Sequence, residues 1–258
     1  MDKIKLGFIG TGAITEHVVV GLIEKGEYRE EIVVSQRNRE RSARLAERFS
    51  NVRVETDNQA IVDQVDWVFV GVLPEQTLEV LEPLAFREGQ TIVSMASIVS
   101  VQELEGKVQP ASQIHRIIPM PPNEVGVGPI PVYPPSREIE ALLASIGTVI
   151  PVGDEAHFSA FSSSSAIMAT FFELVATNAR WMQSKGIPGE ASTRYSTAIF
   201  HSLATQSREL TPAQLQGLSE GCLTAGGLNE QLLKLTRKEG WFDELEAGLD
   251  EILERVST

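Results

Sequence analysis

Short apolar runs alternate with helical patterns over the first half of this chain of 258 residues. The apolar runs predict strands at 4–9, 31–36, 52–55, 66–73, 91–96 and 113–119. The segments between them predict helices at 15–25, 39–49, 58–64, 76–86 and 101–108. The strands are hydrophobic almost throughout, which is typical of a mostly parallel sheet with helices on both faces.

A proline-rich segment at 119–135 interrupts this alternation and predicts a loop with room for one short edge strand. A helix at 136–146 and a strand at 148–152 then complete a doubly wound α/β domain over residues 1–153. The remainder has no strand pattern. It predicts helices at 157–184, 190–208 and 241–256, and one more that is capped by Thr211. We therefore expect an all-helical domain over residues 154–258.

The turn after the first strand, within LGFIGTGAIT, carries Gly10 and Gly12, with Thr15 where a third glycine often stands. In a Rossmann-type dinucleotide site the first glycine permits the bend and the second lets the pyrophosphate approach the backbone. The third position affects only how closely the helix packs on the sheet, so Thr15 is expected to widen that gap slightly and to leave the phosphate site intact. An ordinary glycine-containing turn is the alternative. The predicted cofactor turn comprises Gly10, Thr11, Gly12, Ala13 and Ile14.

The end of the second strand bears on which dinucleotide is bound. An acidic residue there usually binds the free ribose 2′-hydroxyl of NAD(H), whereas arginine and small polar residues suit the 2′-phosphate of NADP(H). This chain has Ser35, Gln36, Arg37 and Asn38, and its first acid is Glu40. The pattern favours NADP(H), with NAD(H) still possible. The alternative is that these residues only begin a solvated helix.

Composition and charge narrow the classes of partner. The chain has 22 basic and 35 acidic side chains and a formal net charge of −13, which disfavours nucleic acid as a partner. There is no uninterrupted run of 18 uncharged apolar residues and the N-terminal residues do not resemble a signal peptide, so we expect a cytoplasmic protein with no membrane partner. One cysteine, Cys222, and four scattered histidines predict no metal site.

The order of several motifs resembles that of the pyrroline-5-carboxylate reductase family, over nearly the whole chain. The most diagnostic is LTAGGLNEQL at 223–232, because it lies in the helical half where a generic dinucleotide-binding protein carries nothing similar. The others are LGFIGTGAIT, TDN at 56–58, VGVLPEQ at 70–76, IVSMAS at 92–97, HRIIPMPP at 115–122, FSSSS at 161–165 and KGIP at 185–188. The resemblance implies reduction of a cyclic imino acid to proline with NAD(P)H, in a homodimer or larger homo-oligomer built from interleaved helical domains.

The resemblance also implies roles for individual residues. Asn58 would lie by the adenosine ribose, Ala96 and Ser97 would flank the nicotinamide, and Val72, Leu73 and Pro74 would line the cofactor. Thr224 and Asn229 are the candidate catalytic residues. The candidate substrate-binding residues are Met120, Ser163, Ser164, Ser165, Thr224, Gly226, Gly227 and Asn229.

Several positions depart from the family pattern. Ser162 to Ala166 replace a serine-glycine-serine-glycine-proline stretch, Met120 and Pro121 replace asparagine and threonine, and Leu73 stands where lysine is frequent. In the signature loop Ala225 replaces proline, and Asn229 replaces a hydroxyl residue. These changes leave two alternatives open: an NADPH-dependent reductase of another imine or a keto compound, and a catalytically silent, NADP-binding regulatory dimer. A β-hydroxyacid dehydrogenase would need a lysine between 154 and 184, where none occurs.

The chemistry of an imine reductase suits this residue set. An imine can arrive already protonated, so positioning replaces a strong catalytic acid, and the sequence has no evident His-Asp or lysine constellation. A substrate carboxylate would fit the backbone N–H groups of the Gly226-Gly227 turn at the start of a helix. The alternative is a plain turn between helices. The serine run at 162–165 has an alternative too, as the N-terminal cap of the following helix.

Overall fold

The computed structural model describes residues 4–208 and 210–257. The chain divides into two compact units. The first runs to Ser162 and also takes in the chain from Leu253 onward, and the second comprises Ser163–Ile252. Whether residues 1–153 and 154–258 are separate domains stays a prediction.

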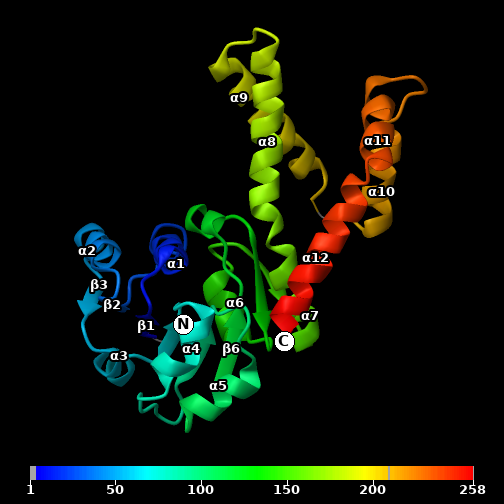
Figure 1. Ribbon diagram of the computed structural model, residues 1–258. Helices are drawn as coiled ribbons and strands as arrows, with labels where there is room; N and C mark the ends of the chain where they lie inside the picture. The colour runs from blue at the N-terminus through cyan, green and yellow to red at the C-terminus, as the bar shows by residue number, and fades with distance from the viewer. Residues whose placement is uncertain (1–3, 209, 258) are drawn as a thin grey trace. The chain divides into compact units, whose positions relative to one another are not determined.

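The first unit is built on one eight-stranded sheet in the order β3-β2-β1-β4-β5-β6-β7-β8 (Figure 1). Every neighbouring pair is parallel except β6 and β7. This confirms the predicted Rossmann-type, mostly parallel sheet, whose direction of winding changes between β1 and β4. The strands are β1 (Leu6–Ile9), β2 (Ile32–Ser35), β3 (Val52–Glu55), β4 (Trp67–Val70), β5 (Thr91–Ser94), β6 (Gln113–Ile117), β7 (Pro129–Tyr133) and β8 (Thr148–Pro151).

Helices cover both faces of this sheet, and each face has its own hydrophobic core. One core joins Leu6 and Phe8 of β1 to α1 (Ala13–Glu24), α2 (Arg39–Arg48) and α6 (Arg137–Leu143). The other joins Ile9 to α3 (Asn58–Gln64), α4 (Pro74–Leu81) and α5 (Val101–Val108). Successive side chains of a strand point to opposite faces, so strands buried on both sides are apolar throughout, as the sequence pattern indicated.

The proline-rich segment corrects one expectation. It contains the 3₁₀ helix η1 (Pro121–Val125) and β7, and β7 lies between β6 and β8 rather than at the edge. The carbonyls of Gly128 and Val132 accept hydrogen bonds from the N–H groups of Thr148, in β8, and Val152, just after it, at 2.8 and 2.9 Å. Pro129 and Pro131 occupy the alternate positions, so their missing N–H groups are not needed in that ladder.

The second unit is helical. Its helices are α8 (Ile167–Ser184), α9 (Gly189–Gln206), α10 (Pro212–Gly221) and α11 (Leu228–Lys238), with α7 (Glu155–Ser164) and α12 (Trp241–Ser257) crossing the two boundaries between the units. The single helix expected at 157–184 is interrupted after Ser164. Serine is a weak interior helix residue, and four consecutive serines lower the propensity at this point.

Candidate functional site

A cleft of about 790 Å³ opens where the carboxyl ends of the parallel strands meet, over the change of winding between β1 and β4. This is the place where open α/β sheets bind dinucleotides. Its walls follow five strands in turn. The lining residues are Gly10, Thr11, Gly12, Ala13, Ile14, Arg37, Asn38, Arg39, Gly71, Val72, Leu73, Pro74, Gln76, Met95, Ser97, Ile118 and Pro119.

The glycine turn at the floor of the cleft is held by side-chain hydroxyls. Gly10 has φ +93°, and a Cβ there would lie 2.6 Å from the carbonyl oxygen of Gly71, so glycine is required. Thr15 is buried, and its hydroxyl donates to the Gly10 carbonyl at 2.7 Å. The residue at the third glycine position thus holds the turn as well as packing the helix.

Ser35 contributes to the turn rather than to the cleft. Its hydroxyl accepts a hydrogen bond from the backbone N–H of Gly10 at 2.9 Å, and its carbonyl accepts one from the Thr11 hydroxyl at 2.6 Å. Ser35 is buried and does not line the cavity. Its sequence neighbour Gln36 also lies outside the lining.

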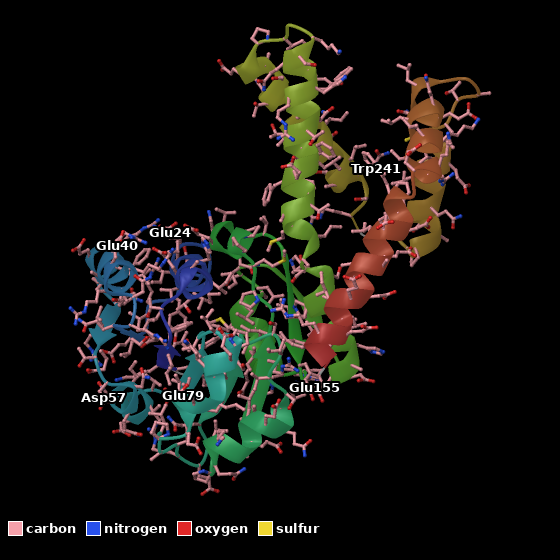
Figure 2. All side chains as sticks on the ribbon, viewed as in Figure 1. Glu24, Glu40, Asp57, Glu79, Glu155 and Trp241 are labelled. Carbon is pink, nitrogen blue, oxygen red and sulfur yellow. The ribbon has the colours of Figure 1, made fainter. Side chains whose placement is uncertain are left out.

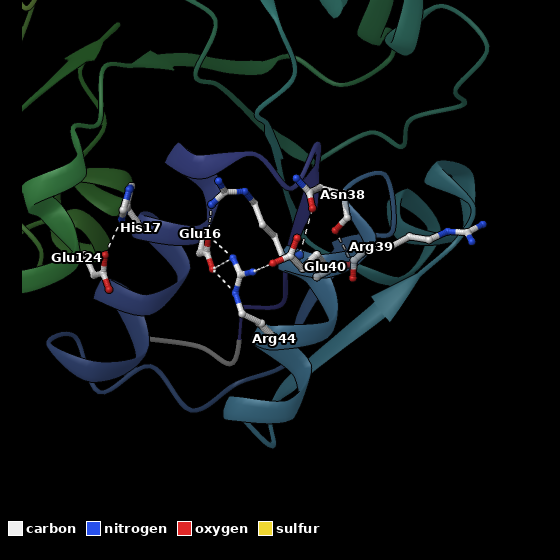
Figure 3. Close-up of polar contacts among 9 residues, drawn as sticks. Glu16, His17, Asn38, Arg39, Glu40, Arg44 and Glu124 are labelled. Atoms are coloured by element: carbon white, nitrogen blue, oxygen red, sulfur yellow. Dashed lines mark hydrogen bonds and ion pairs between the residues drawn. The ribbon is translucent and has the colours of Figure 1, made fainter.

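The charges around the end of β2 divide into a paired group and an unpaired group (Figure 3). Glu16, in the first turn of α1, forms ion pairs with Arg41 and Arg44. Burial opposes ionisation of Glu16, but hydrogen bonds from Arg44 and Arg41 outweigh it and lower the pKa of the carboxyl below its ordinary value. Among the described residues, Arg37 and Arg39 have no carboxylate within ion-pair distance. Both line the cleft, so they give it a positive end.

The cleft gathers most of the residues proposed for the cofactor but not all of them. Asn58 begins α3 and Ala96 is buried, and neither lines the cavity. The sequence reasoning missed Gly71, Gln76, Met95, Ile118 and Pro119, and did not place Arg39 in the site. The signal that could have found them is their position shortly after β2, β4, β5 or β6, because the carboxyl ends of these parallel strands lie at one edge of the sheet.

The candidate substrate turn lies in the second unit, between α10 and α11. Gly226 has φ +73°, which favours glycine. Its N–H donates to Oε2 of Glu230 at 2.7 Å, and the N–H of Gly227 donates to the Thr224 carbonyl at 2.7 Å. Asn229 donates from Nδ2 to the Cys222 carbonyl at 3.1 Å. The anion-binding donors expected here therefore already have partners within the chain.

The serine run spans the end of α7, and Met120 lies in the segment between β6 and η1. Ser163 and Ser164 end α7, while α8 has Ala166 at its N-cap with no side-chain hydrogen bond. The alternative in which a serine caps α8 is therefore wrong. Ser163 is buried. Met120 precedes η1, and its N–H donates to Oδ1 of Asn123 at 2.6 Å.

The titratable groups of the described residues offer neither a metal centre nor an evident proton donor. No group of three or more histidine, cysteine, aspartate or glutamate side chains there has the arrangement to hold a metal ion. Burial lowers the pKa of His115, and its Nδ1 lies 2.8 Å from the Pro134 carbonyl. The ring is therefore held as a neutral, packed side chain.

Residues 5–97 match a family model described as NADP oxidoreductase, coenzyme F420-dependent. Pyrroline-5-carboxylate reductase of Corynebacterium melassecola is 27% identical over 216 residues, covering 79% of this chain and 80% of that protein. The enzyme of the same name from Pseudomonas aeruginosa is 25% identical over an alignment of 267 residues, covering 99% of this chain and 96% of that protein. The sequence likeness thus extends through the helical half.

A solved structure shows the same fold. Plasmodium falciparum pyrroline carboxylate reductase, crystallised with NADP bound, superimposes with a TM-score of 0.83 at 17% identity. The match covers 99% of this chain and 98% of that chain.

Proposed function

We propose that this chain is a member of the pyrroline-5-carboxylate reductase family and that it reduces a cyclic imine with NADPH, converting pyrroline-5-carboxylate to proline. The observation that carries this proposal is the cleft at the carboxyl end of the sheet, which combines a glycine turn with two unpaired arginines. The glycine turn and the start of α1 suit the pyrophosphate, and Arg37 and Arg39 suit the 2′-phosphate.

The residues of the cleft fit the cofactor at both ends. If the 2′-phosphate binds at the end of β2, the segments that follow β5 and β6 would hold the nicotinamide. Met95, Ser97, Ile118 and Pro119 form that wall and are largely apolar, which excludes water from the reacting carbon. When bound there, NADPH would supply a hydride to the imine carbon, and the already protonated imine nitrogen would become an amine. The chain then has only to bind, orient and enclose the two reactants.

A direct assay tests the proposal. We expect the purified protein to oxidise NADPH when pyrroline-5-carboxylate is added, with the loss of reduced-cofactor absorbance matched by the proline formed. Cofactor binding without turnover on this or any other imine would instead support the silent, NADP-binding dimer. No saturable binding of NADPH would exclude both.

One observation favours a second substrate. The carboxylate of Glu230 already occupies the N–H of Gly226 and is paired with Lys234 at 2.7 Å. Two hydrogen bonds to the ionised form lower the pKa of Glu230 below its ordinary value, the bond from Lys234 contributing most. A substrate carboxylate at this turn would have to compete with a fixed negative charge. An imine without a carboxylate, such as 1-pyrroline, would not.

The variant Glu230→Gln separates the two substrates. It removes the charge and keeps an oxygen that can accept from Gly226. If the turn contacts the substrate, kcat/KM for pyrroline-5-carboxylate rises about tenfold, the scale of one charge-assisted contact. The value for 1-pyrroline stays within about twofold of the parent. Glu220→Gln, which removes an exposed charge from α10, is the control. Equal changes for both imines would place Glu230 outside the substrate site.

A homodimer or larger homo-oligomer accounts for the surface of the helical unit. Its exposed apolar side chains include Phe171, Phe172, Leu174, Trp181, Tyr195, Leu203, Leu232, Leu235, Trp241 and Phe242. Figure 2 shows Trp241 at the start of α12. An apolar surface of this kind marks an interface. A second copy offers a matching apolar surface, because the two contacting surfaces of a two-fold dimer are identical.

One segment, Glu155–Ser184, is also long and apolar enough to cross a membrane, with a mean hydropathy of 1.3. Glu173 and Arg180 form an ion pair in its C-terminal half, and exposed apolar side chains also occur on α9, α11 and α12. Both features favour a protein partner, and we propose a cytoplasmic oligomer. Sedimentation should give a mass of at least twice 28.2 kDa. A monomer at micromolar concentration, or a protein that requires detergent, would contradict this.

A further inference from the structure

Arg116 of β6 is the most buried charged side chain near the cleft, and the mechanism above does not use it. It is 3% exposed and lies on β6 opposite Ser94, the last residue of β5. Its guanidinium reaches in two directions. Nη2 donates to the Ser97 carbonyl at 2.8 Å, and Nη1 donates to Oε1 of Glu155 at 2.6 Å.

Glu155 extends these contacts to a second point on the same segment. It lies in the first turn of α7 (Figure 2), and the oxygen that pairs with Arg116 also accepts from the N–H of Val101 at 2.9 Å. Val101 is the first residue of α5. The ion pair therefore holds both ends of the segment 97–101, which leads from the cleft wall to α5.

The surroundings of Arg116 fix the guanidinium in one orientation. Its Cζ lies 4.5 Å from the centre of the Phe158 ring, and Phe158 is fully buried. Nε is nevertheless a buried nitrogen without a hydrogen-bond partner among the described residues. An uncharged side chain at this position would leave no buried donor unpaired. Arg116 instead keeps its two hydrogen bonds, to the Ser97 carbonyl and to Glu155, and leaves Nε without an acceptor.

We propose that Arg116, with Glu155, is a positioning residue that sets the Ser97 wall of the cleft at the nicotinamide end. This inference rests on the proposed function, because that end is assigned by placing the 2′-phosphate at Arg37. Ser97 lines the cleft, and Ile118, two residues beyond Arg116, lines it from the next strand. One side chain thus fixes the wall against which the reacting ring lies. A shift of that wall would misalign hydride transfer more than it would weaken cofactor binding, because the pyrophosphate and 2′-phosphate contacts lie elsewhere.

The variants Arg116→Lys and Glu155→Gln test this. Lysine keeps the charge but cannot hold two acceptors in a fixed fork, and glutamine keeps the shape of Glu155 without its charge. We expect kcat to fall roughly 10- to 100-fold in Arg116→Lys, and less in Glu155→Gln, while the Kd for NADPH changes less than about threefold. The isotope effect on kcat with NADPH deuterated at nicotinamide C4 should rise, because the hydride step becomes slower.

A readout that does not depend on turnover accompanies these measurements. Backbone hydrogen exchange of the segment 97–101 should become faster in both variants, with and without NADPH. This part of the test remains decisive if the parent enzyme reduces no imine, so failure of the proposed function and failure of this inference are distinguishable.

Arg87→Lys is the matched control. Arg87 also donates to two backbone carbonyls, those of Val62 and Val65 at 2.8 Å each, but it lies outside the cleft lining. The control should keep kcat and the hydrogen exchange of the segment 97–101, and lose no more thermal stability than Arg116→Lys, because Arg87 is exposed. If Arg116→Lys behaves in the same way, or if exchange of the segment is unchanged, the role is structural only. If Arg116→Lys does not fold, Glu155→Gln decides by the same criteria.

Discussion

Replacing Gly12 with alanine is expected to raise the Kd for NADPH on the order of 100-fold, about 2.7 kcal/mol, while the protein folds as the parent does. The reason is an asymmetry between the two glycines of the turn. Gly12 has φ −81° and ψ −175°, which any residue adopts, and a Cβ there would lie 3.8 Å from the Gly71 carbonyl oxygen, an ordinary van der Waals contact. The folded chain can therefore accommodate the methyl group, whereas we expect the methyl group to hinder the approach of the pyrophosphate.

Gly10 gives the contrasting case. Alanine at this position meets both a left-handed backbone conformation and a contact of 2.6 Å with a backbone oxygen, so it destabilises the fold. Calorimetry and fluorescence titration with NADPH together distinguish the two variants. Gly12→Ala should lower the unfolding temperature by only about 2–4 °C, since alanine is a poorer helix N-cap than glycine by about 1 kcal/mol. Unchanged NADPH affinity in a folded Gly12→Ala protein would mean that the cofactor does not approach this turn.

The sequence predicted the sheet because periodicity reports which faces of an element are buried. The continuous apolar runs of β1, β2, β4 and β5 led directly to a parallel sheet, and the glycines located the cleft. The position of β7 in the sheet could not be predicted from hydrophobic periodicity. Its pairing depends on hydrogen bonds to β6 and β8, and a pattern of hydrophobic residues does not record which of its neighbours a strand pairs with.

The polar and charged residues of the site also could not be assigned their partners from the sequence. Serine at the end of β2 was assigned to the phosphate by residue type, yet Ser35 points at Gly10, which is 25 positions away in the sequence. Arg116 lies in the HRIIPMPP motif, but its partner Glu155 is 39 positions away and belongs to none of the motifs. Hydrogen bonds between distant segments are determined by tertiary packing, so residue chemistry alone identifies the candidates but does not assign their partners.

Replacing Arg37 with alanine is expected to raise the Kd for NADPH by roughly 10- to 100-fold and the Kd for NADH by less than about threefold. The two cofactors differ only in the 2′-phosphate, so a selective loss locates that group. Arg37 lines the cleft and, among the described residues, forms no ion pair that would hold it elsewhere. The loss should be smaller at high salt, because screening weakens the contact in the parent protein.

Arg44→Ala is the matched control, since it removes the same charge from the same region. Arg44 is paired with Glu16 and Glu40 and does not line the cleft, so its removal should change both cofactor affinities by less than about twofold. Arg39 lines the cleft beside Arg37, and the double variant Arg37→Ala, Arg39→Ala should abolish the preference for NADPH. If Arg37→Ala weakens NADPH and NADH equally, the arginine contacts a group common to both cofactors. The preference for the phosphorylated cofactor would then have to arise elsewhere in the cleft.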